Sequence, residues 1–270
     1  MHFLLLFSCI YFMRIAAIVE YLGTNYAGFQ IQPNQNTIQL FLQNALSKIA
    51  NHDIKIEASG RTDAGVHALG QVFHFDTESQ RPLSSWQKGA NSYLPHDISI
   101  KWVSEVDQTF HARFNAMERE YQYLLHHTKT PSAIWYQKAG HYGYEINFKL
   151  LDEVLKEFIG KHDFSSFRSS ECQSKKPERI IHCASYQKKE NFILFKFTAD
   201  GFLHHQIRNM MSVILDIVSG KKPLDYVQYL FEVKDRTEAS NTFSPNGLYL
   251  ANIRYEKSFK IVDLKNTVII

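Results

Sequence analysis

The chain of 270 residues contains only three cysteines, Cys9, Cys172 and Cys183. Their number is odd and no two of them form a CxxC pair. A disulfide framework would need paired cysteines, and proteins of oxidising compartments are where such frameworks occur. The cysteine pattern therefore indicates a reducing compartment, and we expect a cytoplasmic protein.

The sequence also lacks a metal-binding motif, although it contains 13 histidines. No HExxH sequence and no paired Cys/His spacing occurs, and these are the patterns that typically hold zinc. Cys172, His182 and Cys183 are best interpreted as scattered core and loop residues. We expect no metal site.

Long apolar runs are missing except at the start, where residues 2–12 read HFLLLFSCIYF. A membrane-spanning helix needs about 20 apolar residues, so this run is too short. It also lacks the basic leader and small-residue cleavage site of a signal peptide. We interpret residues 1–12 as an extension outside the fold, produced by an upstream start codon, with Met13 as the first biological residue. A membrane-associated tail is the alternative. No later segment is long and apolar enough to span a membrane.

The chain has no large excess of charge of one sign, since 30 Lys and Arg against 27 Asp and Glu leave a net charge of +3. This balance does not establish a nucleic-acid partner. Local basic clusters occur at Lys175-Lys176 with Arg179, at Lys188-Lys189 and at Lys221-Lys222. Each alone is typical of a solvated face, because phosphate binding needs several such groups on one surface.

The apolar periodicity predicts alternating helices and strands without internal repeats or low-complexity segments. Strands are expected over 14–21, 71–75, 98–103, 120–126, 180–187, 192–199 and 248–255. Helices are expected over 38–49, 86–94, 150–159, 204–218 and 226–233. This order favours an α+β protein. The aromatic and glycine-rich stretch 130–144 is the expected junction between an N-terminal half, 13–130, and a C-terminal half, 131–270.

One loop motif carries the strongest chemical signal. Two glycines bracket Asp63 in the sequence Gly60-Arg61-Thr62-Asp63-Ala64-Gly65-Val66-His67. Glycine permits backbone conformations and close approaches that suit a ligand-holding loop. A lone Asp on a tight loop is nevertheless most often a turn residue that bonds its own backbone. The motif by itself does not decide between these two interpretations.

Further motifs occur in a fixed order along the chain. They are Gly28–Gln32, Thr37–Gln39, the Asp63 loop with its strand to Thr77, Arg119–Tyr123, His162–Phe167, Gly201–Asn209 and Gly247–Leu250. From Met13 to Tyr255 the chain in this way resembles the TruA-type tRNA pseudouridine synthases. Two departures are Phe29, where the family commonly has Trp, and Met211-Ser212, which replaces a more glycine-like stretch.

The resemblance implies a pseudouridine-synthase fold, with two α/β halves and mainly antiparallel sheets joined around a central RNA-binding cleft. It implies an isomerase, an intramolecular transferase, that converts uridine to pseudouridine at nucleotides 38, 39 and 40 of the tRNA anticodon stem-loop. The target base is flipped out, as enzymes that act on stacked bases require. No cofactor is needed because the reaction adds no group. The expected partners are tRNA and a second copy of the chain in a homodimer, with no membrane.

The resemblance also assigns roles to residues. Asp63 would be the catalytic carboxylate and Arg208 its ionic partner. Tyr121 would stack on the uracil, with its hydroxyl assisting the loss of the C5 proton, and Leu248 would form an apolar wall under the base. Taken alone, such an arginine is as often a surface residue, and such a tyrosine or leucine is most often a core residue.

Two further substrate-binding residues are expected on the same loop, Arg61 as an RNA contact and His67. His67, His204 and His205 are interpreted as structural or RNA-facing rather than as acid–base groups. Tyr123 is interpreted as a core residue.

Several alternatives stay open. Asp63 could attack ribose C1′, attack the base, or abstract a proton to give a glycal-like intermediate. An N-glycosylase would also need a flipped base and a carboxylate, but it would usually want a second acid to activate water. An inactive RNA-binding module and a synthase that modifies other uridines are the remaining alternatives.

Overall fold

The computed structural model describes residues 12–265 and 267–268. The proposed extension therefore lies outside the described residues, except for Phe12. Among the helices of the described part, none has the length and apolarity to cross a membrane.

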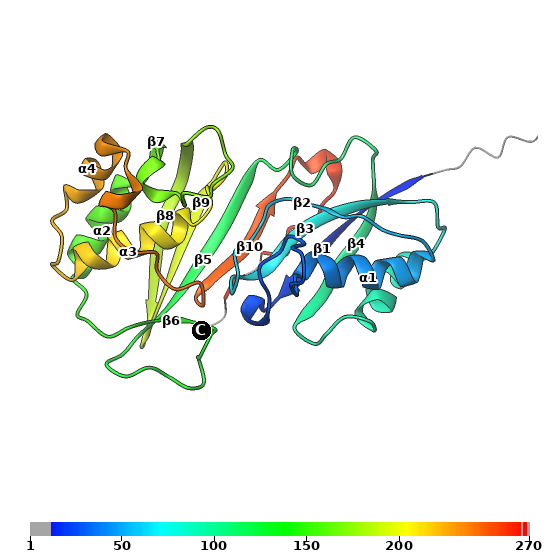
Figure 1. Cartoon of the computed structure of the whole chain (residues 1–270), viewed down its shortest axis with the longest axis horizontal. Helices are drawn as coiled ribbons and strands as arrows, with labels where there is room; N and C mark the ends of the chain where they lie inside the picture. The colour runs from blue at the N-terminus through cyan, green and yellow to red at the C-terminus, as the bar shows by residue number, and fades with distance from the viewer. Residues whose placement is uncertain (1–11, 266, 269–270) are drawn as a thin grey trace, which may run out of the picture.

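A single large sheet runs through the molecule, and nearly all of its strands are antiparallel (Figure 1). Its strand order is β4-β1-β3-β10-β5-β9-β8-β7, with β2 beside β3 and β6 beside β5. The strands are β1 Met13–Tyr21, β2 Glu57–Ala58, β3 His67–Thr77, β4 Ile98–Val106, β5 Glu118–His127, β6 Gly140–Tyr142, β7 Gly160–Asp163, β8 Glu178–Lys189, β9 Phe192–Ala199 and β10 Leu248–Arg254. Among the strand pairs of the described residues, only β3–β10 and β5–β6 are parallel.

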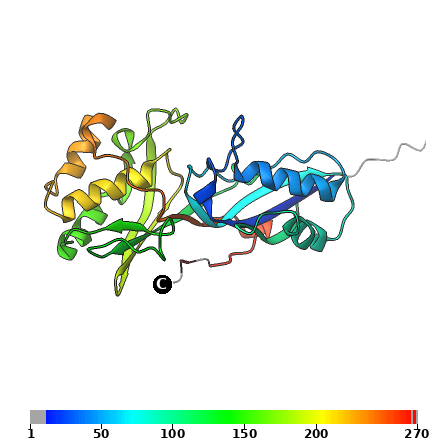
Figure 2. The same cartoon turned by 60° about the horizontal axis from the view of Figure 1, so that its bottom comes forward.

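The helices divide between the two halves of this sheet. They are α1 Ile38–Ala50, α2 Phe148–Glu157, α3 Gln206–Val218 and α4 Tyr226–Val233. Figures 1 and 2 show α1 on one half and α3 on the other, both on the same face of the sheet. Each helix buries an apolar face, and α3 is buried along most of its length, as its run of apolar residues requires. The expected α+β class is confirmed.

The expected helix over 86–94 differs in the structure. It is a π-helical turn at Ser85–Gly89 within a short helical segment that ends at Asn91. Asn91, the last residue of this segment, bonds the backbone of β4 through its side chain. Asn91 Nδ2 donates to Ile100 O at 3.0 Å, and Ile100 N donates to Asn91 Oδ1 at 2.8 Å. The other expected elements are present with small shifts at their ends.

Two large apolar cores lie in the two halves, and each draws residues from both sides of residue 130. The first half's core includes Leu250 and Ile253 from near the C-terminus. The second half's core includes Val66 and Tyr123 from the N-terminal part. The chain thus returns to the centre of the sheet through β10, and the proposed boundary at 130 stays a prediction.

Three central strands bring the expected functional residues together. The start of β3 runs parallel to β10, where His67 lies opposite Tyr249. On its other side β10 pairs with β5, where Leu250 lies opposite Tyr121. The loop before β3, the start of β10 and the middle of β5 are therefore neighbours in space, although they are distant in sequence.

Candidate active site

The loop that carries Asp63 closes in a tight turn. Val66 N donates to Asp63 O at 3.1 Å, and Gly65, the third residue of the turn, has φ of 77°. A positive φ at this position favours glycine over any residue with a side chain. Gly65 is thus needed for the geometry of the turn.

A second glycine outside the motif lets another loop close on this one. Gly28 has φ of 90°, and a Cβ there would lie 2.7 Å from Thr62 O. The close approach allows Phe29 N to donate to Thr62 O at 3.0 Å, while the Tyr21 hydroxyl bonds Thr62 Oγ1 at 2.8 Å. At Gly60, by contrast, a Cβ would meet no atom of the described residues within 4 Å. Close packing on the loop therefore depends on Gly28, and on Gly23, where a Cβ would overlap Val66 O, rather than on Gly60.

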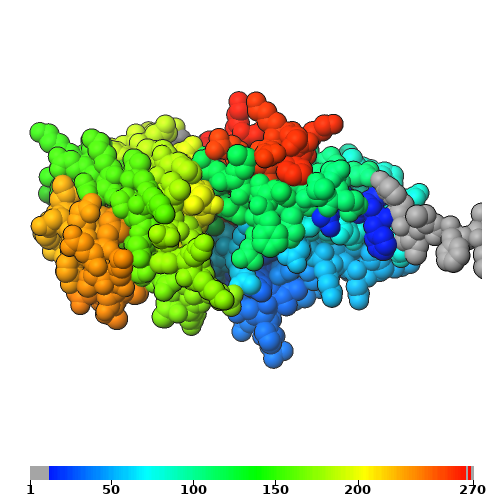
Figure 3. Space-filling model, turned by 90° about the horizontal axis from the view of Figure 1, so that it is seen from above, coloured from blue at the N-terminus to red at the C-terminus, as the bar shows by residue number. Residues whose placement is uncertain are grey.

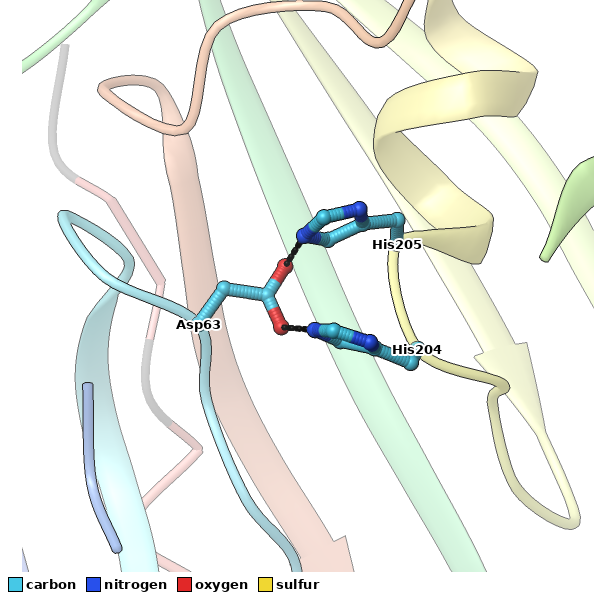
Figure 4. A group of neighbouring side chains, drawn as sticks. All are labelled: Asp63, His204 and His205. Atoms are coloured by element: carbon cyan, nitrogen blue, oxygen red, sulfur yellow. Dashed lines mark ion pairs between the residues drawn. The ribbon is translucent and has the colours of Figure 1, made fainter. Parts of the chain in front are cut away.

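The Asp63 carboxylate faces three basic side chains from the C-terminal half. Its Oδ1 lies 3.3 Å from His204 Nε2, and its Oδ2 lies 3.5 Å from His205 Nε2 (Figure 4). Arg208 Nη1 donates to Oδ2 at 3.3 Å. Asp63 and Arg208 are 18% and 13% exposed. The carboxylate is thus held in a largely desolvated position with positive charge on one side.

The two histidines reach Asp63 because the chain turns sharply before α3. His205 caps this helix with a left-handed backbone of φ 64°, which is uncommon for a residue other than glycine. The turn aims both neighbouring imidazoles at the carboxylate, with ring centroids 4.0 Å apart (Figure 4). Asp63 also lies near the N-terminal end of α3, where the helix dipole favours an anion.

Electrostatics keep Asp63 ionised. Burial tends to raise the pKa of Asp63, but the His204 hydrogen bond and the charges of His205, His204 and Arg208 lower it below its ordinary value. The same hydrogen bond raises the pKa of His204. Burial lowers the pKa of His205. His204 is therefore the histidine that more readily carries a proton beside the carboxylate.

Arg208 is fixed by a second bond. Its Nε donates to Phe243 O at 2.8 Å, while Phe243 N donates to Arg208 O. One guanidinium thus joins α3, the segment before β10 and the Asp63 loop. Because both ends of the guanidinium are used, its direction toward Asp63 is set.

Tyr121 lies on β5, half-buried, with an edge-to-face contact to Phe202 at 5.3 Å between ring centroids. Burial, and then the charge of Asp63, raise the pKa of its hydroxyl. The phenol is therefore neutral at physiological pH. Tyr123, two residues on, is fully buried and donates to Ser244 O at 2.9 Å, which confirms it as a core residue.

The other expected residues lie around this centre. Leu248, the first residue of β10, is 5% exposed and packs in the core of the C-terminal half. Arg61 is exposed, and its Nη1 donates to Gln173 Oε1 at 2.8 Å across the two halves. In the view of Figure 3 the surface is hollowed between the two halves.

His67 is fully buried, and both of its ring nitrogens are engaged. Its Nδ1 accepts from Gly23 N at 3.0 Å, so Nε2 carries the proton and donates to Asn246 O at 3.0 Å. Burial lowers its pKa, so the ring stays neutral. His67 therefore ties three segments together, and neither of its ring nitrogens is left to bond a substrate, contrary to its expected role as a substrate contact.

The contact of His204 and His205 with Asp63 was not expected from the sequence. The only hint in the sequence was that the His204-His205 pair directly precedes the helix of Arg208. If Arg208 reaches the Asp63 loop, the residues at the start of its helix lie close to that loop as well. Nothing in the sequence gives the left-handed turn that aims them. A further unexpected contact is that of Arg119, whose guanidinium donates to Ser59 O at the base of the Asp63 loop.

Asp63, His204 and His205 also form the set of residues best suited to a metal in the described part of the chain. One ligand atom from each lies within 4.8 Å of the others. Two imidazoles and a carboxylate are acceptable zinc ligands. The guanidinium of Arg208, bonded to the same carboxylate, would however stand beside the ion and repel it. The charge balance favours an ion-paired carboxylate over a metal site.

Known proteins resemble the chain along most of its length. A family model described as tRNA pseudouridine synthase matches residues 17–115 and 154–256. The tRNA pseudouridine synthase A of Nitrosomonas eutropha is 45% identical over 249 residues, covering 92% of this chain and 90% of that protein. The protein of the same name from Methylobacillus flagellatus is 43% identical over 244 residues, covering 90% and 94%.

Among solved structures, the archaeal box H/ACA sRNP Nop10–Cbf5 complex contains a similar chain. The two are 13% identical with a TM-score of 0.34, covering 87% of this chain and 60% of that one. A TM-score this low supports no conclusion about this chain.

Proposed function

Because this chain belongs to the tRNA pseudouridine synthases, a family of isomerases that act on uridine in tRNA, we propose that it modifies nucleotides 38, 39 and 40 of the anticodon stem-loop with Asp63 as the catalytic carboxylate. The expected pseudouridine-synthase fold follows from the same membership. Within this proposal each part of the site has a distinct task.

The observation that carries the proposal is the environment of Asp63. The carboxylate is ionised, largely shielded from water and oriented by Arg208 and His204. A carboxylate placed in this way can act as a nucleophile or a base without first having to lose a proton. Arg208 keeps the Asp63 carboxylate ionised and oriented. It contributes to the reaction by positioning Asp63 rather than by contact with the uracil.

The reaction breaks the bond between ribose C1′ and uracil N1 and forms one between C1′ and C5. The base must turn between these steps, and C5 then gives up its proton while N1 gains one. The product is an isomer, so the balance needs no cofactor. Asp63 acts at C1′, at the base or as a proton acceptor, and all three routes need its ionised form.

Tyr121 and Leu248 shape the site for the base. We assign the Tyr121 ring to stack on the uracil, with its neutral hydroxyl assisting the removal of the C5 proton. Leu248 provides the apolar wall. A flipped base loses its stacking in the RNA, at a cost of roughly a few kcal/mol, and these two side chains replace part of that contact.

Arg61 is assigned to the RNA. It is exposed on the same loop as Asp63, and its bond to Gln173 places its charge between the two halves. Positive groups at such a position grip the phosphate backbone, which can supply the energy for flipping. A homodimer and a cytoplasmic location, where tRNA is modified and used, complete the proposal.

The test is the release of tritium from tRNA labelled at uridine C5. Wild-type protein should release tritium, and Asp63→Asn should not. Asp76→Asn is the matched control, because Asp76 pairs with Arg14 at the far end of β3, away from the site. Equal release by Asp63→Asn and wild type would remove Asp63 from the chemistry.

Two further readouts separate the alternatives. Free uracil in the reaction would identify an N-glycosylase, because a synthase retains the base on the RNA. Mapping pseudouridine in tRNA from cells that lack the gene should show losses at nucleotides 38, 39 and 40. Losses at other uridines would replace the assigned positions.

A further inference from the structure

Phe114 exposes 76% of its side chain in the segment between β4 and β5. Single exposed apolar residues are common on protein surfaces, so the exposure alone carries no conclusion. What sets Phe114 apart is how firmly its turn is held and what that turn is attached to.

The turn His111–Asn115 is closed by its own hydrogen bonds. Asn115 N donates to His111 O at 3.0 Å, and His111 N donates to Asn115 Oδ1 at 2.6 Å. His111 Nδ1 accepts from the backbone of Arg113 and Phe114, at 3.1 and 3.4 Å. The rings of His111 and Phe114 contact each other with centroids 4.2 Å apart. The exposed ring therefore stands on a rigid support.

Buried groups anchor the base of this turn. Ala112 is fully buried, its N–H donates to His74 Nδ1 at 3.3 Å, and its carbonyl accepts from the Tyr255 hydroxyl at 2.6 Å. Burial of Ala112 leaves no backbone polar group without a partner, because both its N–H and its carbonyl are hydrogen-bonded. The turn cannot move without disturbing the core.

Arg119 connects the turn to the Asp63 loop. Its Nη2 donates to Arg113 O at 3.0 Å and to Ser59 O at 3.2 Å. Ser59 lies just before the Gly60–His67 motif, and Arg119 lies on β5 two residues before Tyr121. Figure 3 shows the blue-green atoms of the chain around residues 100–125 in the middle of the molecule, next to the hollow between the halves. The turn that carries Phe114 is thus tied through Arg119 to the start of the Asp63 loop and to the strand of Tyr121.

One cationic side chain lies over the ring. The Arg113 guanidinium lies 5.9 Å from its centroid, and Arg113 is itself exposed. A fixed aromatic face with arginine beside it is the combination that proteins use to stack unpaired RNA bases while holding their phosphates.

From these contacts, and resting on the proposed tRNA substrate, we propose that Phe114 is a stacking platform for an RNA base that neighbours the extruded uridine. Flipping one nucleotide leaves its neighbours with an open face, and a rigid ring on a turn that is bonded to the Asp63 loop can cover such a face. Phe114 therefore acts in substrate binding and not in the chemical step.

The experiment compares Phe114→Ala, Phe114→Leu and Phe114→Trp with wild type, on an unmodified anticodon stem-loop transcript. Loss of one base–aromatic stack should raise KM and Kd about 5- to 150-fold and leave kcat nearly unchanged. Phe114→Trp should keep wild-type KM, and its added fluorescence should be quenched by the RNA. Phe114→Leu should behave as the alanine variant, because it keeps apolar area without a π face.

Ile134→Ala is the matched control, since Ile134 is another apolar side chain with 80% exposure, in the separate segment before β6. It should leave KM unchanged. Thermal unfolding of each variant checks the fold, which an exposed side chain should not alter. Sedimentation of each variant without RNA checks whether the Phe114 ring instead contributes to a contact with a second copy of the chain.

Unchanged KM and Kd in Phe114→Ala would overturn the platform, as would a change in its sedimenting mass. Both results differ from failure of the proposed function, in which wild-type protein itself would release no tritium from labelled tRNA.

Discussion

The Arg208 guanidinium donates to the Asp63 carboxylate at 3.3 Å, although the two residues are 145 positions apart in the chain. The contact joins α3, in one half, to the Asp63 loop of the other half. The orientation of the Asp63 carboxylate therefore depends on both halves being folded and docked.

Replacing Arg208 by lysine should lower kcat while the fold persists. Lysine has one compact charge and cannot bond Phe243 O and Asp63 with the fixed fork of a guanidinium. Losing a hydrogen bond to a charged group costs about 1.5–3 kcal/mol, which corresponds to roughly a 10- to 150-fold fall in rate. The fall in rate is measured as tritium release from tRNA labelled at uridine C5. Arg254→Lys, at an exposed pair with Glu118, is the control and should keep wild-type rates. A fully active Arg208→Lys would contradict the positioning role.

The His204 ring should titrate above the ordinary histidine pKa of about 6.5, since its bond to Asp63 raises its pKa. The Asp63–His204 pair therefore stabilises the fold fully below about pH 6.5, and this contribution is lost as pH rises through the raised pKa. At the acid end, the stability from Asp63 is lost as pH falls through its lowered pKa. NMR titration of the histidine rings checks the first statement. In Asp63→Asn the His204 midpoint should fall, and an unchanged midpoint would show that the carboxylate does not cause the shift.

Gly28→Ala and Gly60→Ala should separate a structural glycine from a tolerant one. A Cβ at Gly28 would meet Thr62 O at 2.7 Å in a backbone with φ of 90°, whereas one at Gly60 would meet no described atom within 4 Å. Strain of this kind costs of order 1–3 kcal/mol. Thermal unfolding should show a lower Tm for Gly28→Ala and no loss for Gly60→Ala. Equal Tm values in the two variants would mean that the two loops do not depend on this approach.

Tyr121→Phe should reduce kcat with little change in KM, because it removes the hydroxyl and keeps the ring for stacking. Steady-state kinetics on labelled tRNA measures both constants. Tyr123→Phe is the matched control on the same strand, and it should lower Tm through the lost bond to Ser244 O without a specific effect on kcat. If Tyr121→Phe keeps wild-type kcat, the hydroxyl has no part in the loss of the C5 proton.

Local sequence predicted most of the elements. The spacing of apolar residues gave α1, α4 and the hairpin of β8 and β9 nearly to their ends, because burial of one face is a local property of the pattern. The π-helical turn near Trp86 was not predicted, since the spacing of apolar residues does not distinguish a single π-helical turn from an α-helical one. The position of β10 was equally hidden, because strand order depends on contacts between distant segments.

The sequence by itself determined the family resemblance and, through it, the candidate residues, namely an acid on a glycine-bounded loop, an arginine on a helix and a tyrosine on a strand. The motifs can be recognised without the structure because each consists of residue types at a fixed local spacing, which the sequence gives directly. Only the tertiary structure decided that His204 and His205 face Asp63, that His67 is buried with both nitrogens engaged, and that Phe114 stands on a turn tied to the Asp63 loop. These relations depend on how β3, β10 and β5 lie side by side and on one left-handed turn before α3, and both are set by the packing of the whole molecule.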